Sequence, residues 1–200
     1  MNNYEYIIAS LPVIGQDDRN SKELDVEEIH SMILGQLGSK DRKVFETLLA
    51  GFDPDSLDAA FYRSALSSPC RFIREYFSYD MKVRNTKVEF LNGRLGRPAG
   101  TDVILLDEDP DSGDFEGKDE IMAVLDQEDI LGRERGLDDL MWKKCEELSL
   151  MHVFDIDVIL GFTARLQIIN RWLRLNPETG RELFRKLVNE IRNSKTEYGN

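Results

Sequence analysis

The chain has 200 residues, of which 41% are hydrophobic and 32% charged, and its formal net charge is -12 at pH 7. This length allows one domain or two small lobes with a substantial core. The acidic balance argues against a general nucleic-acid binder, because contact with phosphates rewards a positive surface. No run of residues approaches the ~20 apolar positions that a membrane-spanning helix needs.

The first fifteen residues, MNNYEYIIASLPVIG, contain an apolar core that no basic region precedes and that Glu5 interrupts. We therefore expect this stretch to belong to the fold and not to be a signal peptide. Tyr4 to Ile8 fits either a short strand or the start of a helix. Cys70 and Cys145 match no metal-binding or redox spacing, and without an export signal we expect them to be reduced thiols in a cytosolic protein.

Helical periodicity dominates the rest of the N-terminal half. The pattern predicts a helix over residues 24–37 with Asp25 as its N-cap, because a capping side chain stands just before the first periodic residue. Ser39 is placed to cap a second helix that ends at Gly51. The Asp53-Pro54 pair then begins a third, short helix.

The segment from Pro69 to Arg97 carries seven Lys and Arg residues against three Asp and Glu residues, in a chain that is acidic as a whole. It reads as one long helix with the proline in its first turn. More than half of its circumference is apolar, which predicts a helix covered on more than one side. Asp80 and Arg84 lie one turn apart within this apolar arc. Because an unpaired buried charge is costly, we expect them to form a partly buried pair.

Residues 98–118 combine prolines and glycines with acidic residues, which is typical of a loop. This loop is predicted to join an N-terminal helical lobe, residues 1–97, to a C-terminal one, residues 119–200, although one continuous domain is also possible. Val103 to Leu106 could form a short strand.

Asp107, Asp109 and Asp111 stand at alternate positions in this loop, as calcium ligands do in an EF-hand. The rest of that motif is missing, because Ser112 replaces its central glycine and Lys118 replaces its final glutamate. We therefore expect the segment to be a mobile connector that binds no metal tightly.

Helical periodicity returns after residue 120 and predicts helices over residues 121–125, 137–150, 155–175 and 177–191. The third of these carries a wide apolar face with Arg165 in its middle. Two interpretations of this residue stay open. Its guanidinium reaches water along the protein surface, or it forms a bidentate pair with a carboxylate across a helix interface.

Charge is distributed unevenly. Residues 71–97 carry 7 positive and 3 negative groups, and residues 161–200 carry 8 and 4, whereas residues 98–160 carry 5 and 19. Either the basic helices pair with the acidic segments inside the fold, or the surface is dipolar and orients the protein between two partners.

Catalytic motifs are missing from the sequence. Only two histidines are present, His30 and His152, and no phosphate-binding loop, nucleophile elbow or zinc-protease motif occurs. This lowers the odds of an enzyme without excluding one whose acidic residues assemble only in the folded chain.

Two stretches of the long basic helix carry a family resemblance. Tyr79-Asp80-x-Lys82-Val83-Arg84-Asn85-x-Lys87 and Asn92-Gly93-Arg94-Leu95-Gly96-Arg97 resemble the helix signature of the C-type coupling subunit of V/A-type ATPases, which is called d in the eukaryotic enzymes. The chain is still more similar to a shorter bacterial family of unassigned function that accompanies V/A-type ATPase genes. That likeness lies in YxYxxASLP near the N-terminus and in RLQxxxRWL over residues 165–173.

The resemblance implies an all-helical, non-catalytic coupling subunit without cofactor or metal. It would seat the central stalk on the ring of membrane proteolipid subunits, at the cytoplasmic face and without inserting into the bilayer or binding nucleic acid. Two hundred residues accommodate about two of the three helical units of the C-type subunit. The candidate structural or partner-contact residues are Asp80, Arg84, Asn85, Arg94, Arg97, Arg165, Arg171 and Arg174. An adaptor unrelated to the motor and a small enzyme are the alternatives.

Overall fold

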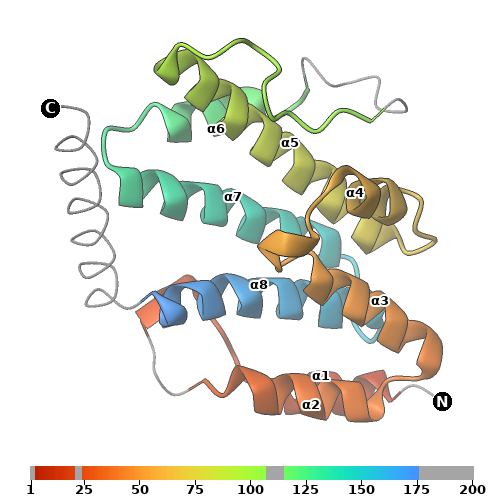
Figure 1. Cartoon of the computed structure of the whole chain (residues 1–200). Helices are drawn as coiled ribbons and strands as arrows, with labels where there is room; N and C mark the ends of the chain where they lie inside the picture. The colour runs from red at the N-terminus through yellow and green to blue at the C-terminus, as the bar shows by residue number, and fades with distance from the viewer. Residues whose placement is uncertain (1–2, 21–23, 107–114, 176–200) are drawn as a thin grey trace, which may run out of the picture.

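The computed structural model describes residues 3–20, 24–106 and 115–175, and all the regular structure in these ranges is helical (Figure 1). The predicted all-α fold class is therefore confirmed. Tyr4 to Ile8 is helical, and residues 103–106 form no strand. The elements are α1 (Tyr4–Ser10), η1 (Gln16–Asn20), α2 (Val26–Gln36), α3 (Ser39–Ala50), η2 (Pro54–Ser56), α4 (Ala59–Leu66), α5 (Arg71–Leu95), α6 (Lys118–Leu125), α7 (Ile130–Ser149) and α8 (Ile156–Arg174).

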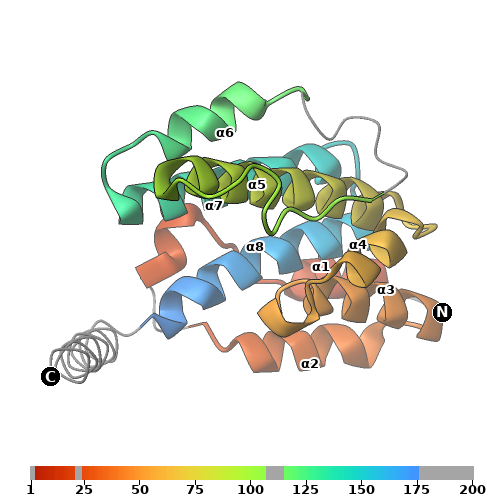
Figure 2. The same ribbon diagram turned by 45° about the horizontal axis from the view of Figure 1, so that its top comes forward.

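Helix α8 has neighbours on both sides. It packs against α7 on one side and against α1, α3 and η1 on the other, and Figures 1 and 2 show α7 and α8 side by side in the middle of the molecule. Helix α5 in turn contacts α3, α4, α6 and α7. Its wide apolar arc is therefore covered from several directions, as its sequence predicts.

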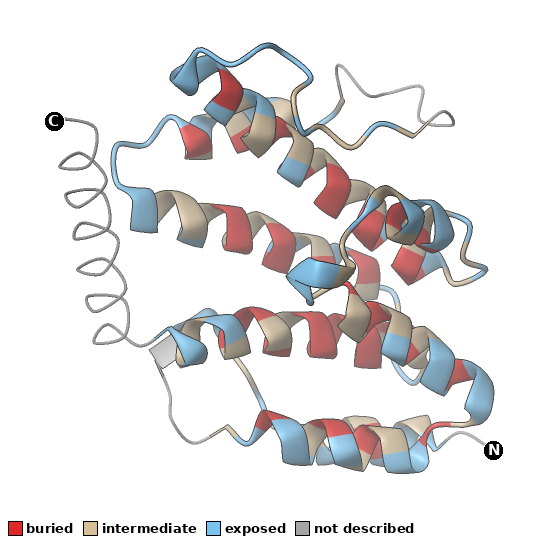
Figure 3. Cartoon of the chain, viewed as in Figure 1, coloured by how far each residue is buried: buried red, intermediate tan, exposed pale blue. Residues whose placement is uncertain are grey.

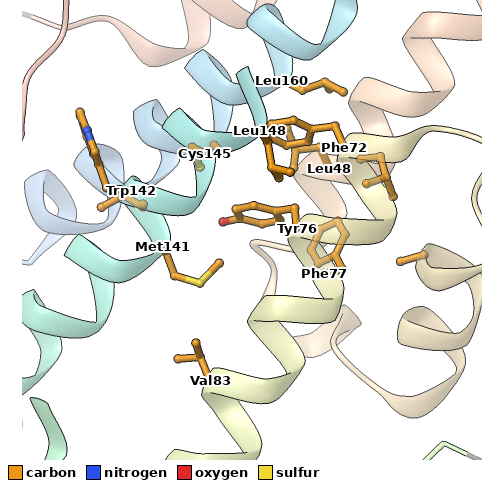
Figure 4. Packing of buried hydrophobic residues seen from close by; sticks show 14 of the residues in the cluster. Leu48, Phe72, Tyr76, Phe77, Val83, Met141, Trp142, Cys145, Leu148 and Leu160 are labelled. Carbon is orange, nitrogen blue, oxygen red and sulfur yellow. The ribbon is translucent and has the colours of Figure 1, made fainter. Parts of the chain in front are cut away.

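One cluster of buried side chains runs through the molecule, from Ile7 in α1 through Tyr76 in α5 to Ile169 in α8. Figure 3 shows the buried positions along the inner faces of the helices, and Figure 4 shows Tyr76 of α5 next to Met141 and Cys145 of α7. Both predicted lobes thus contribute to this core.

Aspartate side chains begin several of the helices. Asp25 accepts a hydrogen bond from the backbone N–H of Glu28, as predicted, and α4 and α7 begin in the same way at Asp58 and Asp129. Such a cap satisfies N–H groups that have no partner inside the helix. The predicted cap at Ser39 is wrong by one position, because Ser39 is the first helical residue of α3 and Gly38 stands at the cap.

The long helix is shorter than predicted at both ends. It begins at Arg71, because Cys70 has an extended backbone with ψ of 121°, and Pro69 therefore lies before the helix and not in its first turn. At the other end Gly96 adopts a left-handed φ of 65°, which glycine reaches without a steric penalty. The N–H of Arg97 then bonds back to the carbonyl of Asn92 and closes the end of the helix.

Gly161 allows α7 and α8 to approach closely. A Cβ atom at this position would lie 2.1 Å from the Oγ atom of Ser149 in α7. That hydroxyl already donates to the carbonyl of Cys145, so it is held in the contact. A side chain at position 161 would force the two helices apart near their connection.

No helix within the described residues is long and apolar enough to cross a membrane. The predicted helix over residues 177–191 lies outside the described residues. So does most of the acidic loop, residues 107–114, including its three alternating aspartates.

Candidate functional site: two aspartate clusters, their arginines and a neighbouring cleft

The first polar cluster joins α4 to α5 around Asp80, which is 8% exposed. Its Oδ2 atom accepts a hydrogen bond of 2.6 Å from the hydroxyl of Tyr62 and one of 2.7 Å from Nε of Arg84. The predicted Asp80–Arg84 pair is therefore present, with a buried acid and a half-exposed guanidinium. Burial, and next the Asp80 charge, raises the pKa of the Tyr62 phenol well above its usual range, so the phenol stays a donor.

A second cluster of the same kind joins α7 to α8 around Asp138, which is also 8% exposed. Its Oδ2 atom accepts from the indole N–H of Trp172 at 2.6 Å and from Arg171 at 2.5 Å. Both donors lie on α8, so both bonds cross the helix interface. The arginine stacks near the Trp172 ring at 5.7 Å.

Glu134, one turn before Asp138 on α7, extends this cluster to α5. Its Oε1 atom accepts a hydrogen bond of 2.5 Å from Lys87, and its Oε2 atom lies 3.8 Å from Arg171. Three helices are thus connected through charged side chains. Basic residues of α5 and α8 meet acidic residues of α7, which agrees with the first of the two interpretations of the charge pattern.

Two asparagines on α5 hold the segment that follows the helix. The Asn85 side chain donates to the carbonyl of Ile104 at 2.8 Å and accepts from its N–H at 3.0 Å. Asn92, which is 2% exposed, donates to the carbonyl of Thr101. These contacts fix residues 101–104 against α5, so the candidate residue Asn85 has a structural role.

Three of the candidate arginines lie at the surface. Arg94 contacts Asp126 at 3.5 Å and its side chain is mostly exposed, and Arg97 contacts Asp102 at 2.7 Å and is half exposed. Arg174 lies 3.9 Å from Glu27, and both side chains are mostly exposed. Exposed pairs of this kind add only about 0–1 kcal/mol to stability, so these residues remain accessible to a partner at little cost.

Arg165 forms no bidentate pair. One of its terminal nitrogens lies 3.8 Å from the exposed Glu146, its Nε donates to the carbonyl of Gly161, and its guanidinium lies 5.4 Å from the Trp142 ring. The Arg165 side chain is only 23% exposed, so most of it is packed, and its guanidinium lies between the Trp142 ring and the exposed Glu146 at the edge of the protein. The interpretation in which Arg165 forms a bidentate pair across a helix interface is wrong, because its contact with Glu146 of α7 is a single one of 3.8 Å to an exposed carboxylate.

A cleft of about 640 Å³ opens between α4, α5, α7 and the segment that leads into α6, and its lining includes none of the residues of the first cluster. Arg74, Lys82 and Lys144 line it together with Glu75 and Glu116, and a smaller hollow of about 290 Å³ adjoins it. Tyr79 borders both. Burial, and then Glu120 and Glu147, raises the pKa of the Tyr79 phenol to about 12. The cleft is thus lined by three basic and two acidic side chains, with the neutral phenol of Tyr79 at its border.

The cysteines and histidines of the chain are packed against neighbouring residues or bonded to them. Burial raises the pKa of the Cys145 thiol to about 12, and burial also raises the pKa of Cys70, so neither is poised as a thiolate. Burial lowers the pKa of His30, which packs edge-on against the Phe45 ring. The Nε2 atom of His152 accepts from Arg71 at 2.9 Å.

That bond fixes the tautomer of His152, because an arginine can only donate. Its Nδ1–H group therefore donates to Asp155, and both ring nitrogens are engaged. Among the described residues no group of three metal-ligating side chains comes together. The clusters described above thus connect helices to one another.

The sequence patterns did not identify Tyr62, Asp138 and Trp172 as members of the two clusters. They also did not identify Asn92 as a residue that bonds to the segment after α5. Asp138 carried a usable signal, since it is a charged residue between the buried positions Leu137 and Met141 of an apolar helix face. Its donors lie more than thirty residues away in the chain, however, so the periodicity of one helix could not identify them.

Comparison with protein families gives a match in the C-terminal half of the chain. A family model described as "Protein of unknown function (DUF2764)" matches residues 109–195, which include α6, α7 and α8. The second aspartate cluster therefore lies largely within the matched region, and the first lies outside it. No curated protein and no solved structure matches the chain.

Proposed function

We propose that this protein is a non-catalytic coupling subunit of a V/A-type rotary ATPase that seats the central stalk on the membrane proteolipid ring. The observation that carries this proposal is the place of the residues that resemble the helix signature of the C-type subunit. They lie along α5, where Asp80 bonds to Tyr62 of α4 and Asn85 bonds to the segment that follows the helix, while Arg84 supports Asp80 from within α5. A part that transmits torque needs such fixation, because a loosely packed helix would yield under load.

The charged contacts from α5 to α7 and from α7 to α8 support the same role. Lys87 of α5 bonds to Glu134 of α7, which also lies near Arg171 of α8. A displacement of α5 would therefore also move α7 and α8, because these contacts connect the three helices. Helices that move together in this way suit a subunit that transmits torque.

The exposed members of the signature offer a partner face at the C-terminal end of α5. Leu95 is 68% exposed and follows Arg94, and Ile130 at the start of α7 is 72% exposed. Exposed apolar residues next to a charged group are typical of a protein–protein contact. We place the stalk or ring contact at this end of the molecule.

Deletion of the gene tests the function directly. Nucleotide hydrolysis by the catalytic head should persist, while ion transport driven by it is lost. Normal coupled transport in the deletion strain would rule the proposal out.

Co-purification from native membranes separates the proposal from its adaptor alternative. The tagged chain should retain stalk or proteolipid subunits, and the double variant Arg94→Glu, Leu95→Asp should lose them while folding normally. Arg63→Glu, an exposed charge reversal on α4, serves as the matched control. A chain that carries no rotary ATPase subunit under these conditions belongs to the adaptor class.

A further inference from the structure

Four apolar side chains are exposed together in the connection between α7 and α8. Leu150, Met151, Val153 and Phe154 are 78, 88, 66 and 56% exposed, and we call these residues the apolar tip. Most apolar residues at a protein surface are scattered singly, whereas a contiguous group marks an interaction site.

His152, the residue at the centre of the apolar tip, fixes the tip to the rest of the protein. The imidazole donates to Asp155 and accepts from Arg71, and Arg71 also donates to the carbonyl of Leu148 at 2.8 Å. The tip is therefore preorganised on three helices and would lose little conformational entropy on binding, which favours affinity.

The surroundings of the tip are negative. Asp155 and Asp157 lie beside His152, and Glu75 lies 3.7 Å from Arg71, which is the cation of this group. Three carboxylates against one guanidinium disfavour a membrane with anionic headgroups and favour a partner surface with a basic rim.

The chain itself carries such a surface. A groove of about 440 Å³ lies between the first turns of α3 and the segment before α5, lined by Val44, Thr47 and Pro69 and bordered by Lys40 and Lys43. Within the described residues neither lysine forms an ion pair. The methyl groups, the proline ring and the lysine stems give the groove an apolar floor and a positive rim. We call it the basic groove.

Tip and groove are neighbours on one side of the molecule. Pro69 of the groove stands two residues before Arg71, which bonds to His152 in the tip. Figures 1 and 2 both place the start of α3 and the α7–α8 connection on the same side. A two-fold symmetric interface needs a single self-complementary patch, and a projection next to a matching hollow satisfies this requirement.

We propose that two copies of this chain form a symmetric dimer in which the apolar tip of each copy inserts into the basic groove of the other. The partly exposed Asp155 then approaches Lys40 and Lys43 of the second copy, while Met151 and Phe154 fill the apolar floor. This dimer uses the end of the molecule opposite the exposed end of α5, so it does not depend on the proposed ATPase role.

Sedimentation velocity of the full-length chain over a wide range of concentration tests the dimer. The wild type should show a monomer–dimer equilibrium, and Met151→Asp with Phe154→Asp should weaken it at least about tenfold, as loss of buried anchor residues does. Lys40→Glu with Lys43→Glu should weaken it comparably. Ile130→Asp, which changes an equally exposed apolar residue at the far end of α7, should leave it intact.

Mixing the two double variants gives the decisive result. A dimer of either variant with itself has a changed residue set in both of its tip–groove contacts. In the mixture, the unchanged groove of the tip variant can bind the unchanged tip of the groove variant, which restores one intact contact. A heterodimer should therefore form in the mixture, detected by native mass spectrometry. Circular dichroism confirms that both variants are folded.

Three outcomes would overturn the proposal. The wild type stays monomeric up to its solubility limit, or the mixture forms no heterodimer although both variants are folded, or the tip variant instead loses binding to phospholipid vesicles that the monomeric wild type binds. The last result would assign the tip to a lipid surface.

Discussion

The Asp80 and Asp138 clusters have nearly the same composition but join their helices differently. Each centres on an aspartate that is 8% exposed and binds one aromatic donor and one half-exposed arginine. In the first cluster Arg84 lies on the same helix as Asp80, so Tyr62 alone crosses to α4. In the second, both donors cross from α8 to α7. Similar bonds can therefore stabilise either one helix or an interface.

The largest effect should follow from Asp138→Ala. This change leaves the Trp172 N–H and the Arg171 guanidinium without their shared acceptor at the central interface. Arg171 is half exposed and can turn to water, so the cost is that of a Trp172 N–H without an acceptor, about 1–3 kcal/mol, plus that of a charged hydrogen bond across the interface, about 1.5–3 kcal/mol. Chemical denaturation would measure the sum as a lower free energy of unfolding. Glu128→Ala, at an exposed carboxylate before α7, should change it little. If Asp138→Ala and Glu128→Ala lowered the free energy of unfolding equally, the second cluster would contribute no more to stability than an exposed carboxylate does.

Asp80→Ala should destabilise the protein less. The buried Tyr62 hydroxyl loses its acceptor at a cost of about 1–3 kcal/mol, but Arg84 is half exposed and can turn to water. Glu75→Ala on the same helix removes an exposed carboxylate and serves as the control. A loss as large as that of Asp138→Ala would contradict the view that only one bond of this cluster joins two helices.

Alkaline pH should distinguish the clusters, because Tyr62 can ionise and Trp172 cannot. The folded state holds the pKa of Tyr62 above its usual range through burial and the nearby Asp80 charge. Its contribution is therefore complete below the unfolded pKa of about 10 and is lost as the pH rises above it, by up to roughly 1.4 kcal/mol per pH unit.

Tyr62→Phe should reduce this loss, measured as the change in unfolding free energy between pH 9 and higher pH, about one unit above the unfolded phenol pKa. Part of the alkaline loss should persist, since burial also raises the pKa of Tyr76 and Tyr79. Trp172→Phe should lower stability at every pH without changing the slope. An unchanged slope in Tyr62→Phe would mean that the phenol titrates alike in the folded and unfolded states.

The smallest effect is expected for Arg165→Ala. This side chain stacks on Trp142, makes one long contact to the exposed Glu146 and donates a hydrogen bond to the carbonyl of Gly161 within its own helix, which together are worth about 1–2 kcal/mol. Arg63→Ala, at an exposed position of α4, is the control and should cost less. A loss of about 3–5 kcal/mol would revive the buried pair predicted from the sequence.

Periodicity and capping determined most of the local structure. The helical class, the Asp25 cap and the Asp80–Arg84 pair could be predicted because each depends on residues three or four positions apart. The start of the long helix was misplaced by two residues, since a proline is compatible both with a first turn and with the extended residues before it.

Only the tertiary structure decided which distant residues meet. The donors of Asp138 and the stacking of Arg165 on Trp142 depend on how α7 and α8 pack together, and the bonds of Asn85 to Ile104 depend on how the segment after α5 folds back. Helix periodicity identifies which face of a helix is buried, but it carries no information about which face of another helix covers it. The sequence by itself therefore determined the helices and their inward faces, and packing chose their partners.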